Sequence, residues 1–381
     1  MTNISTSKKA LQRTLVSAAL LSLVAGAAHA QSSVTLYGRV DLGYQYSDKS
    51  RRADGKDGGS VSELANGGIR PSIFGFKGSE DLGGGLKAFF NLESHFDAGT
   101  GQTTSTFFRR QANVGLSSAD FGTVTLGRQY TPAVLALLAT DPRAIKEQFS
   151  SLYTFALNQA GGGSNGNDLG IFAANAISYN KSFGPVNVGL LYGFGEQADT
   201  MKAGNFISAG VVYTGPITVS AYYNEIKNSA TSGAAKDAKS EQYGVGVAVP
   251  FANFGLPALT AKAQYINAKQ DALNDAIGAQ RSDTDHFSVG VDYAWNATNV
   301  ASISYYHSDN DKISKDKTEM FVLNNDFSLS KRTVIYIQTA IVDSDEGSTY
   351  FTQALLGPKG QLSPVLDKTN VIFGVGISHS F

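Results

Sequence analysis

The sequence predicts an all-β protein, a closed antiparallel transmembrane barrel of sixteen strands. Three observations lead to this fold class. Charged residues make up only 17% of the 381 residues while 42% are apolar, which is few charges for a chain whose whole surface faces water. Apolar residues alternate with small or polar residues along most of the chain, as they do in strands. Short and long connections also alternate between the expected strands, which is typical of transmembrane barrels.

The first thirty residues have the pattern of a secretory signal peptide. The basic residues Lys8, Lys9 and Arg13 precede an apolar run, and an Ala-His-Ala site ends at Ala30. The run is too short for a membrane anchor, which needs about 20 apolar residues. We therefore expect residues 1–30 to be cleaved off and residues 31–381 to form a single barrel.

The period-two alternation is clearest in residues 186–194, 243–249, 287–295 and 371–381, where one parity is apolar and often ends in an aromatic residue. A soluble β-sandwich also alternates, but the Gly-rich polar parity and the aromatics at strand ends favour a membrane barrel. No strand edge can stay unpaired in hydrocarbon, so the sheet must close, and sixteen strands enclose an aqueous lumen. The expected strands are residues 33–47, 69–79, 85–97, 106–117, 122–130, 173–183, 186–195, 205–214, 216–226, 240–250, 258–270, 283–294, 299–309, 317–329, 332–342 and 369–381.

Four segments carry a family resemblance. Residues 33–41 (SVTLYGRVD), 75–86 (GFKGSEDLGGGL), 110–116 (RQANVGL) and 121–130 (FGTVTLGRQY) resemble the early strands and first turn of general porins of Gram-negative bacteria, especially the β-proteobacterial type. The last strand resembles the signal that the barrel-insertion machinery reads; the residues concerned are Phe373, Ile377, His379 and Phe381.

The resemblance implies an outer-membrane homotrimer, surrounded by lipid and lipopolysaccharide, that passes ions and small hydrophilic solutes by diffusion. It also implies a third long loop that folds into the lumen as a constriction loop. Residues 131–167 are the longest gap between expected strands, and such a gap is uncommon unless it is functional or disordered. The apolar start of this gap, residues 132–138, suits packing against a wall better than exposure to water, and a short helix is possible there.

Strand parity selects the side chains that face the lumen. In the first strand Leu36 and Val40 face outward, so their neighbours face inward. Arg128 shares the outward parity of Val124, yet the resemblance places it at the constriction; a β-bulge before the third loop would reconcile the two, and a trimer interface is the other way to hide it. The expected basic wall is Arg39, Lys77, Arg109 and Arg128, and the other expected lumen residues are Tyr37, Asp41, Lys87 and Glu93.

Two acids lie on the expected constriction loop, Asp141 and Glu147, and the resemblance implies that such acids face a basic wall. Each could instead be a solvated loop residue, and Arg143 and Lys146 on the same loop blunt its negative charge. The chain also has Ile73 and Phe172 at two places where the family often has Arg. We therefore expect a weak anion preference at most.

Other function classes find little support. The 31 basic and 32 acidic residues give no basic footprint for nucleic acid. The absence of Cys excludes Cys-ligated metal sites, and no nucleophile elbow, metalloprotease or P-loop motif is present, so we expect neither an enzyme nor a cofactor or metal. A channel of the same fold with a preferred solute remains an alternative, and a plugged structural or adhesive barrel is a further one.

Overall fold

The computed structural model describes residues 33–52, 54–104, 106–153, 170–198, 200, 202–229, 238–271, 282–353 and 364–381. The expected signal peptide lies outside these residues, as does the end of the expected constriction loop. The described residues form two short α-helices, one 3-10 helix and seventeen strands. The strands are β1 (Ser33–Ser47), β2 (Val61–Asn66), β3 (Ile73–Gly83), β4 (Leu86–His95), β5 (Gln111–Ser118), β6 (Gly122–Tyr130), β7 (Phe172–Phe183), β8 (Val186–Gly193), β9 (Phe206–Thr214), β10 (Thr218–Lys227), β11 (Lys239–Pro250), β12 (Leu259–Gln270), β13 (Ser282–Asn296), β14 (Asn299–Asn310), β15 (Lys317–Ser328), β16 (Thr333–Ser344) and β17 (Lys368–Ser380).

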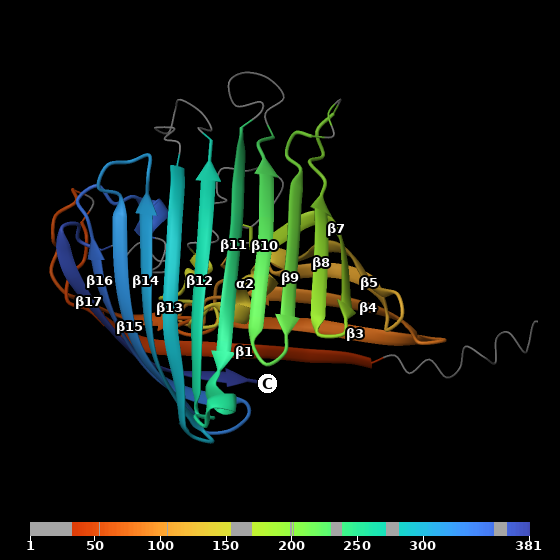
Figure 1. The fold of residues 1–381 in the computed structure, drawn as a ribbon, viewed down its shortest axis with the longest axis horizontal. Coiled ribbons are helices and arrows are strands. Elements are labelled where there is room, and N and C mark those ends of the chain that lie inside the picture. The colour runs from red at the N-terminus through yellow and green to blue at the C-terminus, as the bar shows by residue number, and fades with distance from the viewer. Residues whose placement is uncertain are drawn as a thin grey trace, which may run out of the picture.

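The strands close into one antiparallel barrel (Figure 1). From β3 to β17 each strand pairs with the next in sequence, and β1 closes the ring by pairing with β17 on one side. On its other side β1 pairs with β3 along its first half and with β2 along its second half. β2 and β3 are therefore two parts of one position in the ring, and the barrel has the sixteen positions that the alternation predicted.

The break between β2 and β3 corrects the expected second strand. Its predicted range began at residue 69, but regular pairing begins at Ile73, and the earlier strand β2 was not predicted. Pro71 explains the interruption, because proline has no N–H to donate to a strand partner. We call residues 67–72 the β2–β3 segment.

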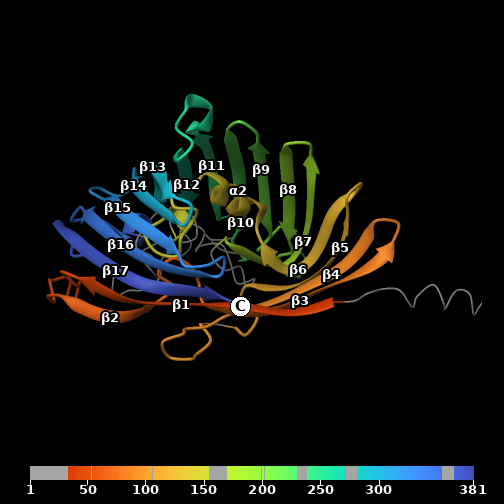
Figure 2. The ribbon, with the colours of Figure 1, turned by 90° about the horizontal axis from the view of Figure 1, so that it is seen from below.

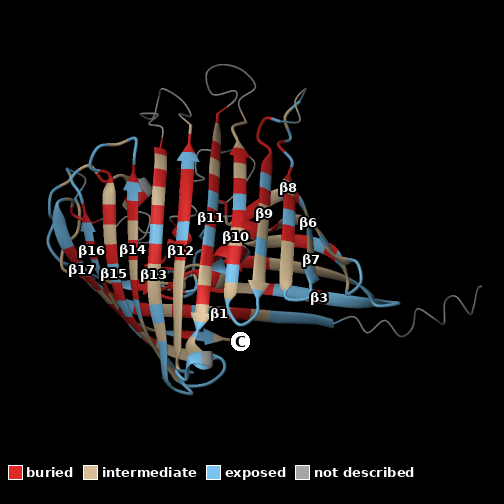
Figure 3. Cartoon of the chain, in the orientation of Figure 1, coloured by how far each residue is buried: buried red, intermediate tan, exposed pale blue. Residues whose placement is uncertain are grey.

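The alternation of the sequence separates two faces of the barrel (Figure 3). On β13, for example, Phe287 and Val291 are exposed on one face while Ser288 is buried on the other. This follows from the period of two in a strand. Aromatic side chains pair across neighbouring strands on the exposed face, as in a membrane-interface girdle; the pairs are Tyr223–Tyr243, Tyr265–Phe287 and Tyr305–Phe321.

Short turns join the strands at one end of the barrel and longer connections at the other (Figure 1). Only Gly184 and Pro185 link β7 to β8, and Gly184 takes the positive φ of 58° that so tight a turn requires. The C-terminus lies at the short-turn end, where Gly38 and Phe381 exchange backbone hydrogen bonds of 3.2 and 3.1 Å. The alternation in connection length is thus as the sequence predicted.

Helix α2 (Pro132–Thr140) follows β6 and lies on the concave side of the sheet (Figure 2). Its start is defined by the Thr131 side chain, which accepts a hydrogen bond of 3.2 Å from the Val134 N–H. Its apolar residues pack on β8–β12, where Leu137 joins a buried cluster with Tyr222 and Ile266. Two further short helices are η3 (Phe251–Phe254), in the β11–β12 turn, and α4 (Tyr350–Gln353), in the β16–β17 connection.

Candidate functional site

The candidate site lies where the chain after β6 meets the inward faces of the strands. We call residues 131–153 the loop segment. Near one end, the Gln264 amide donates to the Leu137 carbonyl over 2.7 Å. Farther along, Lys146 pairs with Asp326 of β15 at 2.7 Å. The loop segment therefore reaches from the wall formed by β8–β12 to the wall that includes β15.

A second apolar contact fixes the far end of the loop segment. Phe149 is fully buried against inward residues of β14–β17, including Tyr306, Met320 and Val322. Beside it the Arg143 guanidinium donates to the Gln338 side chain over 2.8 Å and lies 5.9 Å from the Phe149 ring. Apolar burial at both ends, rather than charge alone, thus holds the segment in place.

The two loop acids have different surroundings. Asp141 is fully buried, and its carboxylate accepts hydrogen bonds from the backbone N–H groups of Arg143, Ile145 and Ser151 at 2.9, 2.8 and 3.3 Å. Burial raises the pKa of Asp141, and these hydrogen bonds oppose the increase. The structure thus places Asp141 as a brace within the loop segment.

Glu147 lies against the other side of the barrel. Its N–H donates to the Ile69 carbonyl of the β2–β3 segment over 3.2 Å, and its carboxylate accepts a hydrogen bond from Tyr153. Burial raises the pKa of Glu147, while Tyr153 and the charges of three arginines lower it; the arginines are Arg110, Arg109 and Arg39. Of the two loop acids, Glu147 is therefore the one that interacts electrostatically with these arginines.

We call Arg39, Arg109, Arg110 and Arg128 the arginine group, and an ion pair between Glu93 and Arg110 lies within it. Arg110 donates from Nε to the Glu93 carboxylate over 2.6 Å, and the Tyr37 hydroxyl donates to the other carboxylate oxygen over 3.0 Å. The Arg110 guanidinium also bonds the Tyr130 hydroxyl. Three strands, β1, β4 and β6, thus meet at this pair, which Arg110 joins from just before β5.

Three residues of the expected basic wall lie near this pair, and the fourth, Lys77, lies further along the wall. The Arg39 Nε lies 3.4 Å from the Ser380 hydroxyl, and the Lys77 ammonium lies 5.2 Å from the centre of the Tyr37 ring. Arg109 contacts the His95 ring and the Thr104 hydroxyl, each at 3.2 Å. The structure therefore brings Arg39, Arg109 and Arg128 near Arg110, with Lys77 further along the same wall.

Arg128 reaches this group through the bulge that the sequence predicted. The β6–β7 register shifts between Gly127 and Gln129, which confirms the bulge, and Gly127 has a φ of 106°. Beyond it, the Arg128 Nε donates to the Arg109 carbonyl, and its guanidinium lies 5.7 Å from the Phe172 ring. Simple parity takes no account of a bulge and therefore assigned Arg128 to the outside.

Comparison with known proteins identifies the family. The family model described as Gram-negative porin matches residues 17–347. The chain belongs to the Gram-negative porin family. As a porin of this family it is an outer-membrane channel protein, and it is 32% identical over 378 residues to outer membrane porin protein 32 of Delftia acidovorans, covering 97% of this chain and all of that one.

Solved structures agree with this assignment. The anion-selective porin from Comamonas acidovorans is 27% identical, with a TM-score of 0.75 over 92% of this porin and 100% of that chain. OmpT of Vibrio cholerae, in a structure described as a trimer form, is 15% identical with a TM-score of 0.63, covering 92% of this porin and 99% of that chain. The second likeness shows the fold alone.

Sequence reasoning missed two arginines of the site. Arg110 has outward parity, but it precedes the first residue of β5 and its side chain turns inward to Glu93. Arg70 lies in the β2–β3 segment and interacts electrostatically with Arg39. The adjacent Gly67, Gly68 and Pro71 were the signal that this segment leaves the regular strand.

Asp41 holds the β2–β3 segment in place. Its carboxylate accepts hydrogen bonds from the Gly68 and Arg70 N–H groups at 2.9 and 3.0 Å and from the Tyr336 hydroxyl at 2.9 Å. Asp41 is fully buried, so the structure places it as a brace. Arg70 owes its position beside Arg39 to this brace.

The remaining sequence-selected residues lie apart from the arginine group. Lys87 is exposed near the β3–β4 turn. The C-terminal residues follow the outward face of β17, where Ile377 and Phe381 are each 47% exposed and the His379 ring bonds the Thr333 hydroxyl at 2.8 Å. Phe373 pairs with Tyr46 of β1 in the strand register.

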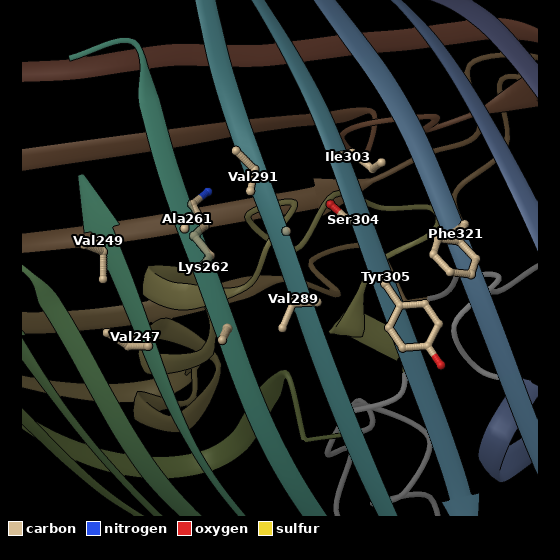
Figure 4. A pocket seen from close by; sticks show the side chains of 12 residues that line it. Val247, Val249, Ala261, Lys262, Val289, Val291, Ile303, Ser304, Tyr305 and Phe321 are labelled. Atoms are coloured by element: carbon tan, nitrogen blue, oxygen red, sulfur yellow. The ribbon is translucent and has the colours of Figure 1, made fainter. Parts of the chain in front are cut away.

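A hollow of about 460 Å³ indents the outward face of the porin between β11 and β15 (Figure 4). The small side chains of Ala261 and Ala263 form part of its lining, between the valines of β11 and β13. Because its lining is outward and almost wholly apolar, it belongs to the membrane-facing surface rather than to the charged site.

Within the described ranges, no three His, Asp or Glu side chains gather in a way that suits a metal ion. No helix in the same ranges is long and apolar enough to cross a membrane.

Proposed function

We propose that this porin forms a water-filled passage for the passive diffusion of ions and small hydrophilic solutes, and that residues 131–167 narrow it as a constriction loop. The position of Glu147, which bonds the β2–β3 segment and interacts electrostatically with Arg110, Arg109 and Arg39, carries this proposal. It supports a passage bordered by the loop segment on one side and by basic side chains on the other. A low-dielectric wall around such a passage focuses the field of its charges.

The proposed passage has a basic wall of Arg39, Lys77, Arg109 and Arg128, to which Arg70 and Arg110 are added. Tyr37, Asp41, Lys87 and Glu93 are proposed as further lining. Of the loop acids Asp141 and Glu147, we assign the larger electrostatic role to Glu147, because the Asp141 carboxylate already accepts three backbone hydrogen bonds. Rings of like charge bias which ions enter a pore.

A weak preference for anions follows from the distribution of ion pairs. On the opposite wall, acids are matched by lysines: Asp292 pairs with Lys262 at 2.8 Å and Asp326 with Lys146 at 2.7 Å. On the arginine side, basic residues outnumber Glu93 and the loop acids. The anion selectivity named for the Comamonas porin supports the same direction.

We further propose that the porin is a homotrimer embedded in outer-membrane lipid and lipopolysaccharide. The trimer form described for the Vibrio structure supports this assembly by analogy of fold. The outward row Phe373, Ile377, His379 and Phe381 on the last strand is the proposed contact of the barrel-insertion machinery. Export would begin with cleavage of residues 1–30.

Charge-neutralising variants test the proposed passage. The purified porin is placed in a planar bilayer under a tenfold KCl gradient, and the reversal potential is compared for the wild type, Arg39→Gln and Lys77→Gln. Both variants should shift selectivity toward potassium. Lys315→Gln is a matched control, because Lys315 lies on an exposed connection and pairs with Glu346. Unchanged reversal potentials for both test variants would refute the assigned basic wall.

A further inference from the structure

Phe172 has an unusual position for an aromatic residue of a charged wall. It begins β7, at a place where the resemblance leads one to expect Arg, and only 3% of its surface is exposed. The guanidinium carbons of Arg110 and Arg128 lie 5.1 and 5.7 Å from the centre of its ring. The Tyr130 ring packs beside it, with ring centres 4.6 Å apart.

Both distances are within the range of cation–π attraction, about 6 Å. An aromatic face attracts a guanidinium without carrying a negative charge, whereas a carboxylate in the same place would cancel the charge that it holds. This site contains both kinds of guanidinium partner, a carboxylate and an aromatic ring. Glu93 pairs directly with Arg110 and so compensates its charge, but the ring of Phe172 adds no such compensation to Arg128.

The ring also brings two like charges to one side chain. Repulsion between two guanidinium groups favours their separation, and their common attraction to the ring opposes it. We propose that Phe172 is a positioning residue for ion selectivity: it keeps the Arg128 guanidinium beside the Glu93–Arg110 pair and thereby holds its positive charge at this point of the wall. This inference rests on the proposed passage, and it explains how the site keeps a basic character where the expected arginine is replaced.

Loss of the aromatic face should change the positions of the two guanidinium groups and with them the ion selectivity. In Phe172→Leu the site stays apolar and roughly filled, but the guanidinium groups lose their common partner. Arg128 then moves away from Arg110, and the positive potential spreads along the wall. Displacing one charge by a few ångströms changes the chloride-to-potassium permeability ratio about two-fold. Phe172→Tyr retains the aromatic face and should retain the wild-type ratio.

The test compares Phe172→Leu in two backgrounds, the wild type and Arg110→Gln/Arg128→Gln, by reversal potential in planar bilayers. We expect the substitution to lower the chloride-to-potassium ratio about two-fold in the wild type and to leave the ratio unchanged in the double variant. A merely structural role would change both backgrounds alike, because packing around the ring does not depend on the charges.

Equal effects in both backgrounds, or no effect in the wild type, would overturn the inference. Electrophoretic mobility of unheated samples shows that each variant is folded, and Phe172→Met replaces Phe172→Leu if the latter does not fold. Failure of the proposed function itself gives a different result, namely folded, inserted wild-type protein that conducts no ions.

Discussion

The pair formed by Glu93 and Arg110 makes a specific prediction about selectivity. Both side chains are largely buried, at 6% and 12% exposure, and their charged atoms are 2.6 Å apart. Glu93→Gln keeps the size of the side chain and an acceptor oxygen for Arg110 and Tyr37, but it removes the negative charge. The charge of Arg110 is then uncompensated, so the wall becomes more attractive to anions.

The size of this effect follows from Coulomb's law. An ion about 7 Å from a unit charge in water interacts with it by about 0.6 kcal/mol, and salt at about 0.1 M reduces this to about 0.3 kcal/mol. Chloride gains this energy and potassium loses it, so their free energies differ by about 0.6 kcal/mol more than in the wild type. The chloride-to-potassium permeability ratio should therefore rise about three-fold.

The assay is the reversal potential of single channels under a KCl gradient at low salt, with unheated-sample electrophoresis to confirm folding. Weaker hydrogen bonds to Gln should cost about 1–3 kcal/mol of barrel stability, which this control detects. Glu346→Gln, in an exposed connection, should leave selectivity unchanged. A Glu93→Gln channel with wild-type selectivity, or one shifted toward potassium, would refute the assignment of this pair to the passage.

Three further predictions concern the loop segment and its neighbours. Burial lowers the pKa of Lys146 to about 8, so the anion preference should fall between pH 7 and about pH 9, and Lys146→Gln should abolish this step in a pH series of reversal potentials. Between about pH 8 and 10.5, the ordinary lysine pKa, the folded chain binds fewer protons than the unfolded chain, so unfolding by denaturant should show stability rising across that range. Phe149→Ala should weaken docking of the loop segment by about 3–5 kcal/mol and increase open-channel current noise, whereas Leu135→Ala, at an exposed position of α2, should not. Gly68→Ala would place a Cβ on the Tyr336 hydroxyl, closer than van der Waals contact allows, while Gly374→Ala makes ordinary contacts from 3.4 Å. Only the first should displace the β2–β3 segment and lower the anion preference, and equal behaviour of the two variants would contradict the bracing by Asp41.

Regular strands were predictable because their pattern repeats every two residues. β1 covers its predicted range, 33–47, since it alternates without interruption until it ends. β6 also covers its predicted range, 122–130, although the bulge before Arg128 interrupts its alternation. The boundaries were less accurate where a strand lacks this alternation. β2 was missed because the sequence around it is rich in Gly and charge, and only its pairing with β1 defines it as a strand.

The site was predictable only in part, because parity gives the face of a residue but not its partner. Parity selected Asp41 as lumen-facing, yet hydrogen bonds to the β2–β3 segment bury it. Arg110 was not selected, because alternation no longer applies at the end of a strand and its side chain follows Glu93. The bulge before Arg128 was foreseen only because family resemblance conflicted with simple alternation. Contacts between segments distant in sequence decide these positions, and no local pattern encodes them.

The central claim is that this barrel contains an open passage whose wall is more positive than negative. Single-channel recording of the refolded wild-type protein under a tenfold KCl gradient tests it most directly. We predict steady ohmic conductance steps, closing in thirds if the protein is a trimer, with a reversal potential displaced modestly toward the chloride equilibrium potential. Folded and membrane-inserted protein that conducts no current, or that clearly prefers potassium, would contradict the account.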